Sequence, residues 1–268
     1  MLSSCKYVIG ELNPLAPVTS RALFSFHMGG WKVVVSNHMF MVGLSVVVLL
    51  AVLWTGMRKS RLVPKGIQNF VELICVYLRD QMARPVLGGH TDQFICFIWT
   101  IFFFILSLNL LSMVPLEMII YLITGKPNHF GGAATANIWV TGGLAMVTFF
   151  VTHIAGIKEQ GFRRYVVNFA PKVPLPMIPL IYALELITAF VRPFALAIRL
   201  FANMLAGHTL LAVLLGLILV FKNYGVALAS ISAVVMVSFL ELFVAFLQAY
   251  IFAFLTTLFI SFSITTEH

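Results

Sequence analysis

The sequence predicts an all-α membrane protein, with N-terminal spans, a surface amphipathic helix and two long, strongly tilted C-terminal membrane helices. Of the 268 residues, 61% are hydrophobic and only 10% are charged. Soluble domains are typically about a quarter charged. Several apolar runs reach the roughly 20 residues that a helix needs to cross a hydrocarbon core. Short basic stretches separate these runs, which is the pattern of a polytopic membrane protein.

The first third of the chain predicts an arm, a span and a surface helix. Residues 1–32 are mixed in polarity and are interrupted by proline and glycine, so we expect an N-terminal arm before an integral membrane domain over 33–268. The first span is expected over 33–57. A second helix is expected over about 64–86, because Pro64 suits a helix start and two glycines follow its end. Its apolar residues recur at helical spacing between charged ones, so we expect it to lie along the membrane surface.

The rest of the chain predicts four more membrane helices. Two ordinary spans are expected over 94–123 and 133–157, and two longer helices over 175–221 and 226–264. At about 1.5 Å per residue the long helices would measure roughly 70 and 58 Å, against a core of about 30 Å. They must therefore tilt, curve or break, for example at Arg192-Pro193.

Positive charge gathers after the first and third spans and predicts that both connections lie inside. The basic residues concerned are Arg58, Lys59, Arg61, Lys65, Lys158, Arg163, Arg164 and Lys172. The N-terminus then starts outside, the first long helix runs outward and the second returns. The net charge of +8 is explained by this bias, so nucleic acid is not an expected partner.

The first long helix carries an unusual row of polar side chains. Glu185, Arg192 and Arg199 follow one another at intervals of seven, which places them on one helix face, and Asn203 lies one turn further. Ionisable groups at such depth are rare and mark functional sites. Ala195, Ala202 and Ala206 flank Arg199 on the same face. Small residues of this kind allow a partner helix to approach closely.

The second long helix repeats the interval with Glu241 and Gln248. If the two helices are antiparallel, Gln248 comes level with Arg199 and Glu241 with His208. Two titratable sites then lie on either side of an arginine, which cannot lose its proton and would block a direct line between them. This arrangement suits a proton path that detours through a second carrier. His208 lies nearly opposite Arg199 on its own helix, and a packing role and a functional one remain open for it.

The remaining polar candidates have structural interpretations. Asn109 is expected to hydrogen-bond between helices, Glu117 to lie at the interface, and His153 and His38 to be packing residues. Arg192 can snorkel or pair with a buried acid. No hydrolase, nucleotide-binding or metal-ligand motif is present, so we expect a non-catalytic chain without cofactor or metal.

At these residues the chain resembles a known family. VRPFALAIRLFANMLAGHTLL resembles the signature helix of subunit a of F-type ATP synthases, and ELFVAFLQAYIFAFLTTLFI resembles its last helix. LVPKGIQNFVELICVYLRD, FFFILSLNLLSMVP and PLPMIPLIYALELI extend the resemblance over most of the chain beyond the arm.

The resemblance implies a proton-translocating stator subunit that forms two offset half-channels against a rotating c-subunit ring. By position, Arg199 corresponds to the essential arginine facing the ring carboxylate, and Asn203 and Gln248 to its polar neighbours. Glu185 corresponds to the inner half-channel acid. His208 and Glu241 correspond to the outer pair, in the order typical of mitochondrial and alphaproteobacterial members.

The implied partners are the c-ring, the peripheral stalk, other membrane-sector subunits and the lipid bilayer. The implied location is the mitochondrial inner membrane, with the bacterial plasma membrane as the alternative. Two other functions remain open: a secondary transporter with a polar site at mid-membrane, and a structural membrane anchor of a complex.

Overall fold

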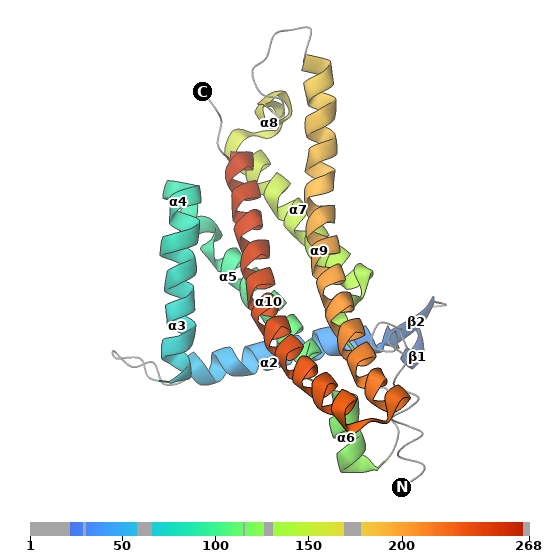
Figure 1. Cartoon of the computed structure of the whole chain (residues 1–268). Coiled ribbons are helices and arrows are strands. Elements are labelled where there is room, and N and C mark those ends of the chain that lie inside the picture. The colour runs from blue at the N-terminus through green and yellow to red at the C-terminus, as the bar shows by residue number, and fades with distance from the viewer. Residues whose placement is uncertain are drawn as a thin grey trace. The chain divides into compact units, whose positions relative to one another are not determined.

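The computed structural model describes residues 22–28, 31–57, 66–114, 116–125, 131–168 and 178–264 (Figure 1). Helices dominate these ranges and confirm the all-α membrane class, with one addition near the N-terminus. There, strand β1 (Ala22–Met28) pairs antiparallel with strand β2 (Trp31–Ser36), with Met28 opposite Trp31 and Ala22 opposite Ser36.

The first membrane-spanning candidate is helix α2, which covers Asn37–Met57. It therefore begins at Asn37, not at residue 33 as the sequence predicted. Residues 33–36 belong to β2. Three consecutive valines stand at 33–35, and β-branched residues favour extended backbone over helix. The basic connection over 58–65 lies outside the described residues.

The helix expected over 64–86 consists of three consecutive pieces. α3 (Ile67–Tyr77) continues through the π-helical turn η1 (Leu78–Ala83) into α4 (Arg84–Leu87). One face is buried from η1 onward, at Leu78, Met82, Ala83 and Leu87. That this helix lies along the membrane surface stays a prediction.

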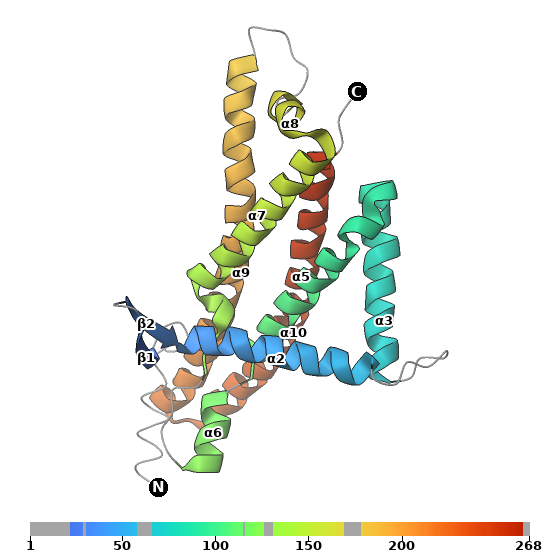
Figure 2. The same cartoon turned by 180° about the vertical axis from the view of Figure 1, so that it is seen from behind.

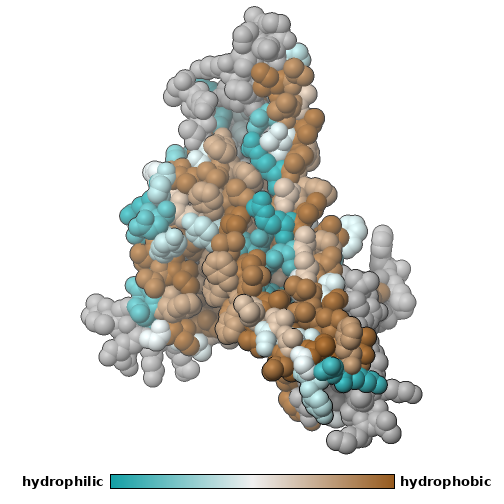
Figure 3. Space-filling model, in the orientation of Figure 1, coloured by the Kyte–Doolittle hydropathy of each residue, from teal (hydrophilic) through white to brown (hydrophobic). Residues whose placement is uncertain are grey.

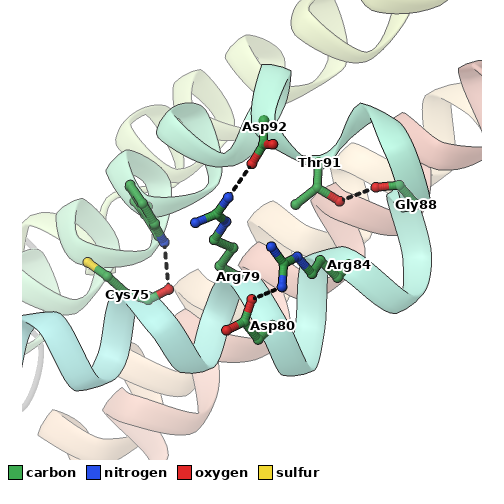
Figure 4. Close-up of polar contacts among 8 residues, drawn as sticks. Cys75, Arg79, Asp80, Arg84, Gly88, Thr91 and Asp92 are labelled. Carbon is green, nitrogen blue, oxygen red and sulfur yellow. Dashed lines mark hydrogen bonds and ion pairs between the residues drawn. The ribbon is translucent and has the colours of Figure 1, made fainter.

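A short 3-10 turn, η2 (Gly88–His90), reverses the chain into α5 (Thr91–Ser112), as Figures 1 and 2 show. Gly88 has φ +54°, a conformation that other residues rarely adopt. Two contacts join the arms of this hairpin: an ion pair of 2.7 Å between Arg79 and Asp92, and a hydrogen bond of 3.1 Å from Trp99 Nε1 to the Cys75 carbonyl oxygen (Figure 4).

The span expected over 94–123 is divided into α5 and α6 (Leu116–Thr124). The division falls at position 115, where the sequence has a proline. Proline has no backbone N–H and disfavours a helical conformation in the residue before it. The structure therefore has two helices, α5 and α6, over the residues where the sequence predicted one span.

The C-terminal half contains the long helices. After the 3-10 turn η3 (Ala134–Ala136) come α7 (Ile138–Gln160), α8 (Phe162–Asn168), α9 (Ile178–Phe221) and α10 (Tyr224–Ile264). α8 is a short helix in the basic connection after the third predicted span, where the sequence predicted no helix. α9 continues through Pro193 without a break. In the described ranges, five helices are long and apolar enough to cross a membrane: Asn37–Gly56, Ile67–Ser112, Ile138–Gln160, Pro179–Phe221 and Tyr224–Ile264.

The chain forms two compact units, which divide α9 after Arg199 and α10 after Gln248. The first unit comprises Met1–Leu49, Phe104–Val140 and Leu200–Gln248. Hydrogen bonds join its segments: Asn37 Nδ2 to the Gly131 carbonyl oxygen at 2.9 Å, and the hydroxyls of Ser45 and Ser107 at 2.6 Å.

The second unit comprises Leu50–Phe103, Thr141–Arg199 and Ala249–His268. The end of α10 lies against two other elements. Ser261 Oγ donates to the Val86 carbonyl oxygen at 2.8 Å, and Ser263 Oγ donates to that of Thr152 at 2.9 Å. Gln160 Nε2 donates to the Ser263 carbonyl oxygen at 2.9 Å. These bonds fix α10 to α4 and α7 within this unit.

Candidate functional site

The row of polar residues predicted on α9 lies on one uninterrupted helix. Glu185, Arg192 and Arg199 occupy successive positions seven residues apart, and Asn203 follows. Figure 3 shows hydrophilic residues in a line along α9, within a largely hydrophobic surface. Arg199 is exposed. Its side chain is therefore available to a group outside the chain.

The side chains around Arg199 on α9 are small and exposed. Ala195, Ala202 and Ala206, which share its face of α9, are all exposed. A helix that packs on this face can therefore bring its backbone close to α9, within reach of the long guanidinium group. The small residues around Arg199 predicted this open face from residue type alone, and their exposure is consistent with it.

Glu185 and Arg192 form an ion pair, with 3.2 Å between Oε1 and the guanidinium nitrogen. The guanidinium also lies 5.5 and 5.9 Å from the ring centres of Phe259 and Phe262 on α10, which is cation–π distance. Arg192 thus pairs with an acid, one of the two structural roles expected for it. It joins α9 to the end of α10 and fixes the carboxyl group of Glu185.

The carboxyl group of Glu241 is buried against α9. Its residue is 5% exposed, and a Cβ at Gly207 would lie 2.6 Å from Glu241 Oε1. Only glycine at position 207 leaves the carboxyl group in this place. His208 is the next residue on α9, so the structure brings Glu241 to the level of His208, as the spacing predicted for antiparallel helices. Their roles stay predictions.

A buried polar row continues along α10. Glu241, Ala245 and Gln248 share a buried face, and Asn109 Nδ2 on α5 donates to the Ala245 carbonyl oxygen at 3.4 Å. The interhelical hydrogen bond expected of Asn109 is therefore confirmed. Its contact with the backbone of α10 between Glu241 and Gln248 was not predicted. Asn109 sits between two hydrophobic runs, and the sequence alone does not say which helix it faces.

Several side-chain atoms of this row are buried without a hydrogen-bond partner in the described part of the chain. They are Asn109 Oδ1, Asn203 Nδ2, His208 Nε2, Glu241 Oε1 and Gln248 Nε2. A buried polar atom without a partner costs about 1–3 kcal/mol. Half of the buried atoms of this kind in the described residues belong to these five side chains, a placement consistent with bound water or a ligand there.

Other candidates lie apart from this row. His153 packs on Phe149, with ring centres 4.1 Å apart, and its Nδ1 lies 2.9 Å from the Phe149 carbonyl oxygen. These contacts agree with the packing role expected for it. His38 is fully buried at the start of α2. The side chain of Glu117 lies outside the described residues. Within those residues, no group of three or more His, Cys, Asp or Glu side chains is arranged to hold a metal ion.

Comparison with known proteins identifies the family. The model of the family described as ATP synthase A chain matches residues 39–261. ATP synthase subunit a of Myxococcus xanthus is 37% identical over 238 residues, which cover 87% of this chain and 74% of that protein. ATP synthase subunit a of Chloroherpeton thalassium is 36% identical over 250 residues, covering 90% of this chain and 69% of that protein.

A third relative, ATP synthase subunit a of an Anaeromyxobacter strain, is 38% identical over 237 residues. These cover 87% of this chain and 55% of that protein, so the chain spans little more than half of this relative. All three relatives are bacterial, and they do not support the mitochondrial location that the resemblance implied. The matched residues contain all of α9 and α10 up to residue 261, and this chain belongs to the ATP synthase A chain family.

Proposed function

We propose that this chain is the proton-translocating stator subunit of an ATP synthase membrane sector in a bacterial plasma membrane. The observation that carries the proposal is the exposed Arg199, on an alanine-lined face in the middle of an apolar helix of 44 residues. A fixed positive charge at such a place calls for an external anionic partner. The c-subunit ring, with its carboxylates, is the partner that the family provides, and the peripheral stalk and bilayer complete the surroundings.

The two sides of Arg199 would serve as offset half-channels. His208 and Glu241, with the amides of Asn203 and Gln248, supply titratable and polar groups toward the end of α9 predicted to lie outside. Asn109 adds an amide to this outer path. Glu185 supplies the acid toward the inside, and Arg192 holds its carboxyl group in place.

In this mechanism a proton enters through Glu241 and His208 and is passed to a carboxyl group of the ring. After the ring has turned, the proton leaves past Glu185. Arg199 stays protonated, attracts the deprotonated ring carboxylate and prevents protons from crossing directly between the half-channels. The chain itself catalyses no bond chemistry, because it only conducts protons for the complex.

Replacing Arg199 with alanine tests the proposal in vesicles that contain the whole complex. We expect proton-driven ATP synthesis to be lost while the complex still assembles, because neutralising the arginine removes the partner of the ring carboxylate. Ile198→Ala is the matched control, since Ile198 is the exposed neighbour of Arg199 on the same helix. Normal synthesis by the Arg199 variant would contradict the proposal and favour a structural anchor. Loss of uptake of a small solute, without any link to ATP synthesis, would favour a transporter.

A further inference from the structure

Two neighbouring hollows, called here the α7–α9 groove, lie between α7 and α9 within the second unit and share Phe149 and Phe190 in their linings. The larger hollow has a volume of about 380 Å³ and is lined by apolar side chains. The lining residues include Gly142, Ala145 and Met146 on α7 and Phe190, Phe194 and Ala197 on α9. The groove is therefore a site for a hydrocarbon chain.

The second hollow adjoins α8 and is also mostly apolar, but three side chains with a polar end are part of its lining. This hollow has a volume of about 240 Å³, and the three side chains are His153 of α7, Tyr165 of α8 and Tyr182 of α9. Phe149 and Phe190 line both parts, and their rings stack with centres 5.4 Å apart. Tyrosine typically marks the level of lipid headgroups in membrane proteins. The change of lining therefore follows the profile of a lipid from its tail to its headgroup.

Three basic residues lie on α7 and α8 close in sequence to His153 and Tyr165, which line the second hollow. Lys158 closes α7, Arg163 and Arg164 lie on α8 beside Tyr165, and all three are exposed. Glu159 is the acidic residue among them, so three positive charges and one negative leave a net charge of +2. No described acidic residue forms an ion pair with any of the three cations. The positive charges of these three side chains, which no described carboxylate neutralises, would attract an anionic group at this end of the groove.

From these observations we propose that the α7–α9 groove binds a phospholipid with an anionic headgroup. An acyl chain occupies the apolar part, and the headgroup lies between Tyr165 and the two arginines of α8. Basic residues at the inner ends of membrane helices are typical sites for anionic lipid headgroups. The site is independent of the polar row on α9 and α10 and does not rest on the proposed proton path.

The tail half of the proposal can be tested with a matched pair of glycine variants. A Cβ at Gly142 or at Gly143 would meet no atom within 4 Å, so a larger side chain can leave the backbone at either position without an immediate clash. Gly142 lines the groove and Gly143 does not. The full-length chain, purified with its accompanying subunits, is incubated with phosphatidylglycerol carrying a photoreactive group in one acyl chain. We expect labelling of α7 and α9 peptides that Gly142→Leu abolishes and Gly143→Leu leaves unchanged.

The headgroup half is tested with the arginines. Arg163→Ala and Arg164→Ala should each weaken phosphatidylglycerol binding roughly fivefold, because a basic residue near the headgroup contributes about one kcal/mol. Lysine at both positions should retain most of the binding, and a photoreactive phosphatidylcholine should label the groove weakly. Equal labelling by the two lipids, or undiminished labelling of Gly142→Leu, would overturn the proposal. The proposal would also be overturned if the lipid probe did not label the groove peptides and these peptides could instead be cross-linked to a helix of another subunit.

Discussion

At the scale of single residues, Gly207 sets how closely α9 approaches the carboxyl group of Glu241. In Gly207→Ala the new methyl would lie 2.6 Å from Oε1, at the flexible end of the glutamate side chain. The carboxyl group can move away, so we expect little loss of stability but a several-fold slower proton-driven ATP synthesis in reconstituted vesicles.

Gly216→Ala is the matched control for this prediction. Gly216 lies on the same helix as Gly207, and a Cβ at Gly216 would meet no atom within 4 Å. It should leave ATP synthesis and thermal stability unchanged. Synthesis by Gly207→Ala at the rate of the unchanged protein would show that the position of the Glu241 carboxyl group is immaterial to proton flow.

The sequence predicted which polar residues of α9 and α10 share a helix face, because a seven-residue interval places side chains on one face of any helix. Glu185, Arg192 and Arg199 were grouped in this way, and the interval also allowed the ion pair of Glu185 with Arg192 that the structure contains. The place of Asn109 beside α10 was not predictable, because contacts between distant helices depend on packing. The alignment of Arg199 with Gln248 stays a prediction, since the two residues belong to different units.

At the scale of elements, Gly156 allows α7 to pack against α8 and the end of α10. A Cβ at this position would lie 2.8 Å from the Ser263 carbonyl oxygen and would overlap Ser263 Oγ and the ring of Tyr165. The obstructing oxygen belongs to the backbone, which cannot rotate away. Gly156→Ala should therefore destabilise the protein by about 1–3 kcal/mol, the usual cost of overpacking.

Thermal unfolding of the purified protein in detergent checks this prediction, with Gly143→Ala as the control on the same helix. The variant should also weaken the hydrogen bonds that Ser263 makes with Thr152 and Gln160. Equal melting temperatures for the two variants would mean that α7 and α10 are not closely packed where Gly156 meets Ser263.

The helices themselves were largely predictable, because apolar length and proline or glycine punctuation identify membrane helices well. The errors fell where a local preference competed with hydrophobicity. A run of valines lies in strand β2 just before α2, and α5 ends at Ser112 within an apolar stretch, shortly before a proline in the sequence. Hydropathy does not distinguish these cases, since the same apolar residues serve both structures.

At the scale of the whole molecule, the charge bias predicts which ends of the helices face inside. α9 has 44 residues and would extend about 66 Å at 1.5 Å per residue, more than the roughly 30 Å of a hydrocarbon core. A short break at residues 222–223 then leads into α10. The basic helix α8 before α9 should therefore lie inside, and the turn after α9 outside.

Cysteine labelling tests this orientation in a chain whose own cysteines, Cys5, Cys75 and Cys96, are replaced by serine. Tyr224 is 95% exposed at the start of α10, and Arg163 is exposed on α8. In right-side-out vesicles a membrane-impermeant maleimide should label Tyr224→Cys at once and Arg163→Cys only after the membrane is permeabilised. The opposite order would invert the orientation and exchange the inner and outer half-channels. Immediate labelling of both would mean that α9 does not cross the membrane, and no proton path along it would then remain.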